Sequence, residues 1–187
     1  MKKYIVICNK DLAVKHPIIV KQYICASPNE ACKAFLNNFF NEKITDHEHA
    51  EKLIKSELRV SLPVIKIIKI RSVWCSGFLL NNNNYSLNII EEPLDQSDEP
   101  FYTIVAYFKK GIYVYQYKSS NAYEALKEWT RHLSWRYYER NERDIIKKSI
   151  GNGRYKHLSF TESHTTQGYI FFIQRRKLVC LITKTKF

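Results

Sequence analysis

The chain has 187 residues, 45% of them apolar and 26% charged, a balance that supports a folded core and argues against a disordered protein. Five glycines and five prolines are too few for a loop-rich scaffold. The net charge of +12 lies almost wholly in the second half: residues 1–106 contain 13 Lys and Arg against 12 Asp and Glu, whereas residues 107–187 contain 17 against 6. Such asymmetry is typical of a protein with a polyanionic partner.

Residue usage predicts an intracellular protein. The five cysteines are an odd number without CxxC spacing, which is typical of reduced thiols in the cytosol. No basic-then-apolar signal sequence opens the chain, and the longest apolar runs are too short to span a bilayer. Abundant Lys, Asn, Ile, Tyr and Phe indicate an AT-rich genome, as in viruses, organelles, parasites and some bacteria. We therefore expect a cytoplasmic protein or a virion component, neither secreted nor inserted in a membrane.

Residues 1–76 predict a first α+β unit. The expected elements are strands at 3–8 and 17–25, a helix from Pro28, a short helix at 45–57 and a strong strand within 59–74. Ser27, Pro28 and Glu30 form a capping box with proline at the first helical position, which marks a helix start. The helix then places Phe35 and Phe39 on one apolar face.

Residues 101–187 predict a second, basic α+β unit with the same order of elements. These elements are strands at 101–108 and 112–118, a helix capped by Asn121, a second helix at 142–150 after a break near Asn141, and a hairpin of 168–174 and 177–187. The first helix is expected to turn Leu126, Trp129, Leu133 and Tyr137 inward. The turn of the final hairpin, at residues 175–177, is basic.

The two units share residues at an offset of 94. The identical pairs are Ile18/Ile112, Val20/Val114, Gln22/Gln116, Tyr23/Tyr117, Glu30/Glu124, Ala31/Ala125 and Lys33/Lys127. The preceding strands align Ile5 with Ile104 if the second hairpin loop is five residues shorter. Identity at polar positions indicates an internal duplication. We therefore predict an α+β fold of two pseudo-repeated units, each a β-hairpin, a helix with a shorter second helix, and a closing strand or hairpin, with an antiparallel sheet packed on helices.

Residues 77–100 are expected to form a linker, Asn-rich first and acidic afterwards. Residues 72–106 contain five acids and no Lys or Arg. The segment is either a solvated connector with turn residues or an acidic strap that lies against the basic second unit and competes with its partner.

Catalytic signatures are weak. The sequence has no glycine-rich nucleotide loop, no GxSxG and no HExxH. The segment Asp46–His49 (DHEH) could bind a metal on a loop, but on a helix its two histidines diverge. Nothing in the spacing pairs Cys25 or Cys180 with a histidine such as His157 or His164. We expect no catalytic residue, no metal and no cofactor.

Clustered cations are the strongest functional signal. On a long helix of the second unit, residues 132, 136, 140, 143 and 147 follow helical spacing as a basic stripe, with aromatic residues among them. The segment Gly151–His157 could cradle a phosphate or simply end a helix. The candidate binding residues are His132, Trp135, Arg136, Tyr138, Arg140, Arg143, Lys147, Arg154, Lys156, Arg175, Arg176 and Lys177. Alternatively, Glu139, Glu142 and Asp144 neutralise the helix, which is then merely solvated.

These features predict a non-enzymatic structural or interaction component of a large macromolecular assembly, such as a minor capsid or other virion protein, whose basic second unit contacts an anionic partner. The expected partners are other proteins of the assembly and the backbone of RNA or DNA. Two alternatives remain: a sequence-independent nucleic-acid-binding protein that favours RNA, and an enzyme of unrecognised type.

Overall fold

Ten strands form two antiparallel sheets in the computed structural model, which describes residues 1–10, 18–43, 63–68, 70–80, 83–92, 100–109, 111–160 and 165–185. The first sheet contains β1 (Lys2–Lys10), β2 (Ile19–Cys25), β3 (Ile65–Lys66), β4 (Val73–Leu80) and β5 (Asn83–Glu92). The second contains β6 (Phe101–Phe108), β7 (Gly111–Lys118), β8 (Lys156–Ser159), β9 (Thr166–Ile173) and β10 (Arg176–Thr185). The described helices are α1 (Pro28–Lys43), α3 (Ala122–Arg131) and α4 (Arg140–Gly151).

The two sheets have the same topology. Their strand orders are β2-β1-β5-β4-β3 and β7-β6-β10-β9-β8, so each strand of the first sheet has an equivalent five places later in the chain. Helix α1 follows the first hairpin as α3 follows the second. The prediction of an α+β fold with two similar units is therefore confirmed. The helix predicted at 45–57 lies outside the described residues.

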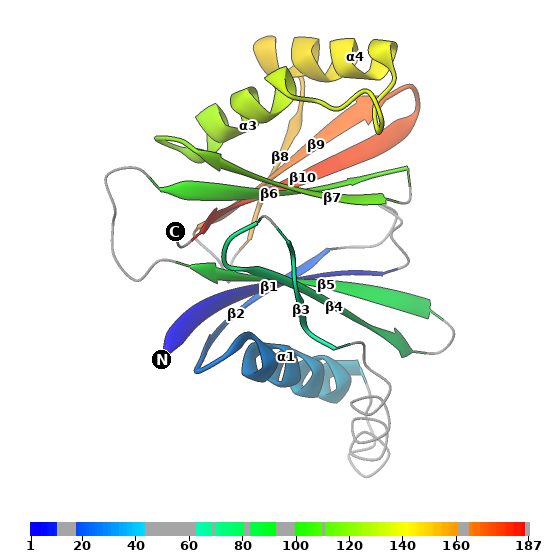
Figure 1. Cartoon of the computed structure of the whole chain (residues 1–187). Helices are drawn as coiled ribbons and strands as arrows, with labels where there is room; N and C mark the ends of the chain where they lie inside the picture. Colours follow the sequence, from blue (N-terminus) through cyan, green and yellow to red (C-terminus); the bar gives the residue numbers. More distant parts are fainter. Residues whose placement is uncertain are drawn as a thin grey trace.

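The two sheets pack face to face, and helices cover their outer faces. Figure 1 shows this order of layers: α1, the first sheet, the second sheet, then α3 with α4. Alternate side chains of β1 serve different layers, because Val6 belongs to the core under α1 whereas Ile5 and Ile7 belong to the core between the sheets. A strand buried on both faces needs apolar residues at successive positions, which explains the uninterrupted run in β1.

Pairing within the hairpins corrects the sequence alignment of the units. Gln22 lies opposite Ile5 in the first hairpin, and Gln116 lies opposite Thr103 in the second. Equivalent residues are thus 94 apart on the returning strands and 98 apart on the first strands, so the second hairpin loop is four residues shorter, not five. A shift of one residue exchanges the faces of a strand. Ile5 accordingly faces the other sheet, whereas Ile104 packs under α3 and α4.

Two predictions for the middle of the chain are wrong. Among the described residues 63–68 and 70–72, the strand expected within 59–74 is limited to Ile65–Lys66, and β4 begins at Val73 after a turn. Residues 77–80 and 83–92, expected in the linker, instead complete β4 and form β5. The asparagines made this strand resemble a turn in the sequence. Asn84 is exposed at the hairpin end, whereas Leu87 and Ile89 pack under α1. The division of the chain into domains stays a prediction.

The predicted helix starts are confirmed. The backbone N–H of Glu30 donates to Ser27 Oγ at 3.2 Å, and the Glu30 carboxylate accepts from the N–H of Ala26 at 2.9 Å. In α3 the N–H of Glu124 donates to Asn121 Oδ1 at 2.9 Å. These bonds satisfy N–H groups that lack partners within the helix. None of the helices in the described part of the chain is long and apolar enough to cross a membrane.

Candidate anion-binding surface

The helix expected to carry the basic stripe is interrupted. Helix α3 ends at Arg131, where the N–H of His132 donates to the carbonyl of Trp129. A new helix, α4, begins after Glu139, whose carboxylate and that of Glu142 form a reciprocal capping box. The single continuous stripe is therefore wrong, because this cap favours a fresh start over continuation of α3. Its residues are divided between the α3–α4 connection (residues 132–139), which contains His132 and Arg136, and α4, which contains the other three.

Tyr138 and Tyr137 exchange the places expected of them. Tyr138 is 1% exposed, and its ring stacks on Phe108 with centroids 5.6 Å apart. Tyr137, expected to point inward, is exposed. The turn after α3 shifts the helical phase, since the N–H groups of both tyrosines donate to the carbonyl of Ser134. Tyr138 is thus a core residue and is removed from the candidate surface.

His132 contacts a neighbouring carboxylate and a tyrosine ring. Its Nε2 is 2.9 Å from a carboxylate oxygen of Glu128, and its ring stacks on Tyr117 with centroids 6.2 Å apart. Arg131 contacts the second oxygen of Glu128 at 2.7 Å. Glu128 thus has two partners at the end of α3, His132 and Arg131, and together they lower its pKa. This local cluster satisfies His132 without an external anion.

Lys109 binds two of the three acids that were expected to neutralise the stripe, Glu139 and Glu142. Its Nζ is 2.9 Å from Glu139 Oε1 and 2.8 Å from Glu142 Oε1. The hydrogen bond from Lys109 lowers the pKa of Glu139, and the two carboxylates raise the pKa of Lys109. Within the described residues, Arg136 and Arg140 form no ion pair. These two arginines are thus not neutralised by an ion pair with a described residue.

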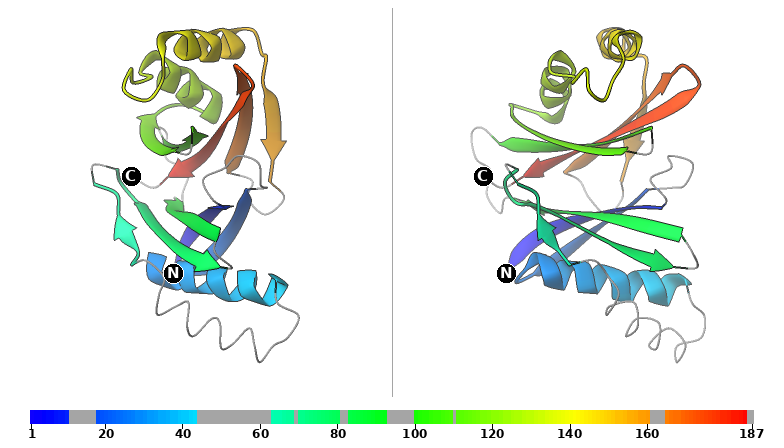
Figure 2. Two further views of the ribbon diagram at one scale, coloured as in Figure 1. Left: turned by 90° about the vertical axis from the view of Figure 1, so that its right-hand side faces the viewer. Right: turned by 45° about the vertical axis from the view of Figure 1, so that its right-hand side comes forward.

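A basic hairpin turn lies beside the start of α4. Arg176 contributes to the lowered pKa of Glu139, which places its charge near that residue. In Figure 1 the turn between β9 and β10 and the start of α4 lie at the same right-hand edge of the second unit, while the turned views of Figure 2 show the α3–α4 connection set apart from this turn. We call this region the basic tip. It comprises Trp135, Arg136, Arg140, Arg175, Arg176 and Lys177, all of them exposed.

The backbone of the turn is in an unusual conformation for its residues. Gln174 and Arg175 have φ values of 47° and 69°. A two-residue hairpin turn with positive φ at both positions usually contains Asn-Gly, because other side chains crowd the backbone there. Arg175 thus holds a strained position at the outermost point of the hairpin.

Trp135 is the aromatic residue of the basic tip, and 73% of its surface is accessible. The guanidinium carbon of Arg136 lies 5.7 Å from the centroid of its ring. This distance permits a cation–π contact. The arrangement presents a flat aromatic surface and a positive charge side by side.

The remaining candidates lie along or beyond α4. Arg143 is half-buried and Lys147 is exposed on the helix, whereas Arg154 and Lys156 follow its end. Twelve helical residues span about 18 Å, so these last two cations are well separated from Arg140. The structure therefore does not bring all the predicted residues into one site.

The segment after α4 is a helix end. The N–H of Asn152 donates to the carbonyl of Lys148, that of Gly153 to Ile150, and that of Arg154 to Ser149. Gly153 has a φ of 65°, as helix ends often require of glycine. Because these N–H groups are already bonded within the protein, they do not form a phosphate cradle.

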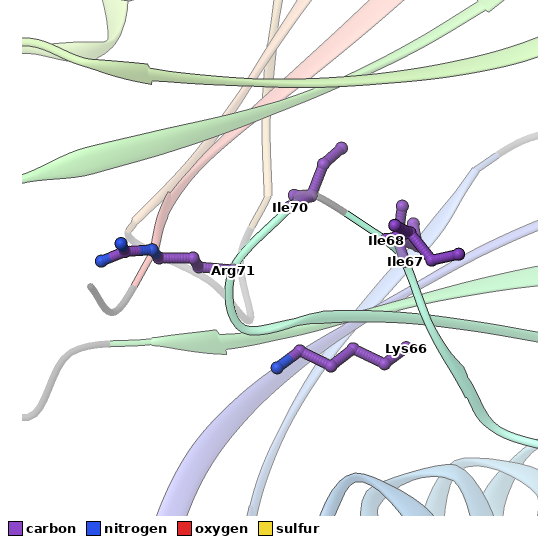
Figure 3. A pocket seen from close by; sticks show the side chains of 5 residues that line it. All are labelled: Lys66, Ile67, Ile68, Ile70 and Arg71. Atoms are coloured by element: carbon purple, nitrogen blue, oxygen red, sulfur yellow. The ribbon is translucent and has the colours of Figure 1, made fainter.

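A small pocket lies in the first unit, at the turn between β3 and β4. It has a volume of about 290 Å³ and is lined by Lys66, Ile67, Ile68, Ile70 and Arg71. Figure 3 shows Ile67 and Ile68 close together, with Ile70 pointing toward the second sheet. Ile68 is 84% exposed. The turn thus combines exposed aliphatic surface with two flanking cations.

Metal and thiol chemistry receive little support. Searching the described part of the chain finds no group of three or more His, Cys, Asp or Glu able to hold a metal ion. Asp46–His49 and His164 lie outside that part. Burial raises the pKa of the Cys180 thiol well above its ordinary value and also raises that of Cys25, whereas a nucleophilic cysteine needs a lowered pKa.

Comparison of the chain with protein-family models, with curated proteins and with solved structures found no match.

Proposed function

We propose that the protein is a non-enzymatic interaction component of a macromolecular assembly, such as a virion or another particle, and that the basic tip of its second unit binds a polyanionic partner. One observation carries the proposal: Lys109 engages Glu139 and Glu142, and Arg136 and Arg140 form no ion pair with any described residue. Uncompensated cations on one surface attract anions and accelerate their association.

The first unit supports a role within an assembly. Its exposed large apolar residues include Ile24, Ile65 and Ile68, two of them beside or in the β3–β4 turn. Exposed aliphatic surface is suited to contact with another protein. The two units would then contact different partners, one through aliphatic and one through cationic side chains.

The proposal is tested on immobilised heparin, a generic polyanion. The double variant Arg136→Glu/Arg140→Glu should elute at clearly lower salt than the wild type, because binding driven by charge weakens as cations are removed. The matched control is Lys33→Glu/Lys66→Glu, which makes the same change of charge at exposed lysines of the first unit.

The control should elute close to the wild type. Equal shifts for both double variants would mean that only net charge matters and that the basic tip is not a binding surface. Co-purification of the wild type with a particle from its native source, and loss of this association in the Arg136→Glu/Arg140→Glu variant, would support the assembly role.

A further inference from the structure

We propose that the partner of the basic tip is a single-stranded polynucleotide, whose phosphates contact the arginines while a base stacks on Trp135. This inference rests on the proposed function and specifies its anion. RNA and DNA share this chemistry, so the experiment distinguishes them.

Exposed apolar residues divide by chemical type between the two units. Among the described residues, those of the first unit are aliphatic: Met1, Ile24, Ile65, Ile68 and Leu79. The ones described in the second unit are aromatic: Trp135, Tyr137 and Phe172. Aliphatic residues suit contact with proteins, whereas aromatic rings among cations are the combination that binds single strands, since every base has a face that can stack.

All three exposed rings lie at or near the basic tip. Trp135 and Tyr137 belong to the α3–α4 connection, and Phe172 lies directly across the hairpin from Lys177. Tyr137 packs against Tyr113, with centroids 4.7 Å apart. Among these rings Trp135 is the most exposed, which makes it the strongest candidate for stacking.

The strained backbone at Arg175 also supports a role of this turn in binding phosphate. Glycine at position 175 would relieve the positive φ of 69°, yet the position holds an arginine. Backbone strain at a surface position often accompanies a functional side chain. An arginine at the outermost point of a hairpin can reach a phosphate with two parallel hydrogen bonds.

A duplex fits this surface less well. Its bases are already stacked on one another, so it offers phosphates to the arginines but no free base to Trp135. An acidic protein likewise needs only the cations. Dependence of binding on Trp135 therefore separates a single strand from both.

The test measures binding of the full chain to four labelled probes by fluorescence polarisation: mixed-sequence single-stranded RNA, the same single-stranded DNA, the corresponding DNA duplex, and polyglutamate. We expect tighter binding of at least one single strand than of duplex or polyglutamate at equal salt. Trp135→Ala should weaken single-strand binding by about ten-fold and leave duplex and polyglutamate binding unchanged. Trp135→Phe should restore part of the loss.

Controls distinguish the aromatic from the ionic contribution. Ile68→Ala removes an exposed apolar side chain from the first unit and should change nothing. Arg140→Gln and Arg176→Gln should each reduce the salt dependence of binding, by roughly 0.7 in the slope of log K against log salt. Trp135→Ala should leave that slope as it is, because it removes no phosphate contact.

Arg175→Gly separates binding from folding. The substitution removes a cation and relieves the backbone, so it should weaken single-strand binding while raising the midpoint of thermal unfolding by roughly 2–4 °C. A residue with a purely structural role would not lose binding as stability rises.

The outcomes are distinct. Binding of polyglutamate as tightly as of single strands, or single-strand binding that survives Trp135→Ala, would overturn the polynucleotide inference and leave the proposed function standing. Absence of binding to all four probes at low salt would overturn both.

Discussion

Gln116 and Arg71 exchange two hydrogen bonds across the junction of the two units. The backbone N–H of Arg71 donates to Gln116 Oε1 at 3.1 Å, and Gln116 Nε2 donates to the Arg71 carbonyl at 3.0 Å. The same Nε2 lies 3.3 Å from Thr103 Oγ1. The side-chain amide of Gln116, on β7, thus bonds both backbone groups of Arg71, as the backbone of a paired strand would. These bonds hold the β3–β4 turn, which carries exposed isoleucines, against the second sheet.

The first prediction concerns this pair. Gln116→Ala should reduce the free energy of unfolding by about 1–2 kcal/mol, because it removes both hydrogen bonds between the Gln116 amide and the backbone of Arg71. Denaturant unfolding followed by circular dichroism measures the change. Gln22→Ala is the matched control, since Gln22 is the equivalent residue and its side chain makes no hydrogen bond to any described residue.

The control should change the free energy of unfolding by less than about 0.5 kcal/mol. Similar losses at both positions would show that the amide contributes through its strand and not through Arg71.

Gln22 and Gln116 also show how far the sequence could predict the fold. Their identity correctly indicated two similar units, because a repeated unit retains its local pattern of strand, turn and cap. It did not reveal what either amide contacts, since the partner of Gln116 lies 45 residues away in sequence. The same limitation explains the missed β5, whose asparagines resemble a turn until Asn88 is seen to donate to Tyr107 of the other sheet.

The six residues of the basic tip were all among the candidates predicted from the sequence, but their arrangement was not predicted. Helical spacing placed five cations on one stripe, but the capping box at Glu139 ended that spacing. Local sequence correctly identified the acids near the arginines. It could not assign them to Lys109, which approaches from the β6–β7 turn 30 or more residues away.

The second prediction concerns the buried hydrogen bond between the sheets. Asn88 Nδ2 donates to the hydroxyl of Tyr107 at 3.2 Å, and both residues are buried. Tyr107→Phe leaves the Asn88 amide unsatisfied and should cost about 1–3 kcal/mol of unfolding free energy. In Tyr107→Phe/Asn88→Leu the loss should be smaller than the sum of the single losses, because the two groups interact.

Tyr4→Phe provides the control for that change. Tyr4 is also buried, but its hydroxyl has no hydrogen-bond partner among the residues that the structure describes. Removing it should leave stability unchanged or raise it slightly. A loss as large as that of Tyr107→Phe would argue that the hydroxyl matters through packing alone.

The third prediction concerns Lys109 and pH. Lys109→Met leaves Glu142 buried without its cation and should reduce the free energy of unfolding by about 2 kcal/mol at neutral pH. The lowered pKa of Glu139 means that its contribution is present above the ordinary value of 4.5 and is lost as pH falls through the folded-state pKa. The raised pKa of Lys109 means that its contribution is lost as pH rises above its ordinary value of 10.5.

The difference between wild type and Lys109→Met should therefore be largest between these limits and shrink in acid. Unfolding at about pH 7 and about pH 3 tests this window. Lys33→Met, at an exposed lysine of α1, should show no such dependence. A difference that stays constant with pH would mean that the methylene chain of Lys109, and not its charge, stabilises the α4 start.

The last prediction concerns Glu92, which is buried at the end of β5. Lys3 Nζ forms an ion pair with Glu92 Oε2 at a distance of 3.0 Å. Burial raises the pKa of Glu92 more than Lys3 lowers it. The fold thus favours the protonated carboxyl, and the ionised form costs stability once pH rises above the folded-state pKa.

Glu92→Gln keeps the shape of the side chain and removes this charge, so it should leave the unfolding free energy at neutral pH unchanged or raise it by about 1 kcal/mol. The gain should disappear as pH falls below about 4.5, where the wild-type carboxyl is itself protonated. Glu91→Gln makes the same change at the adjacent position, where the ion pair with Lys2 at 3.3 Å is lost, and should give no gain. A loss of about 2 kcal/mol or more in Glu92→Gln would show instead that the attraction of Lys3 outweighs the desolvation of the carboxylate.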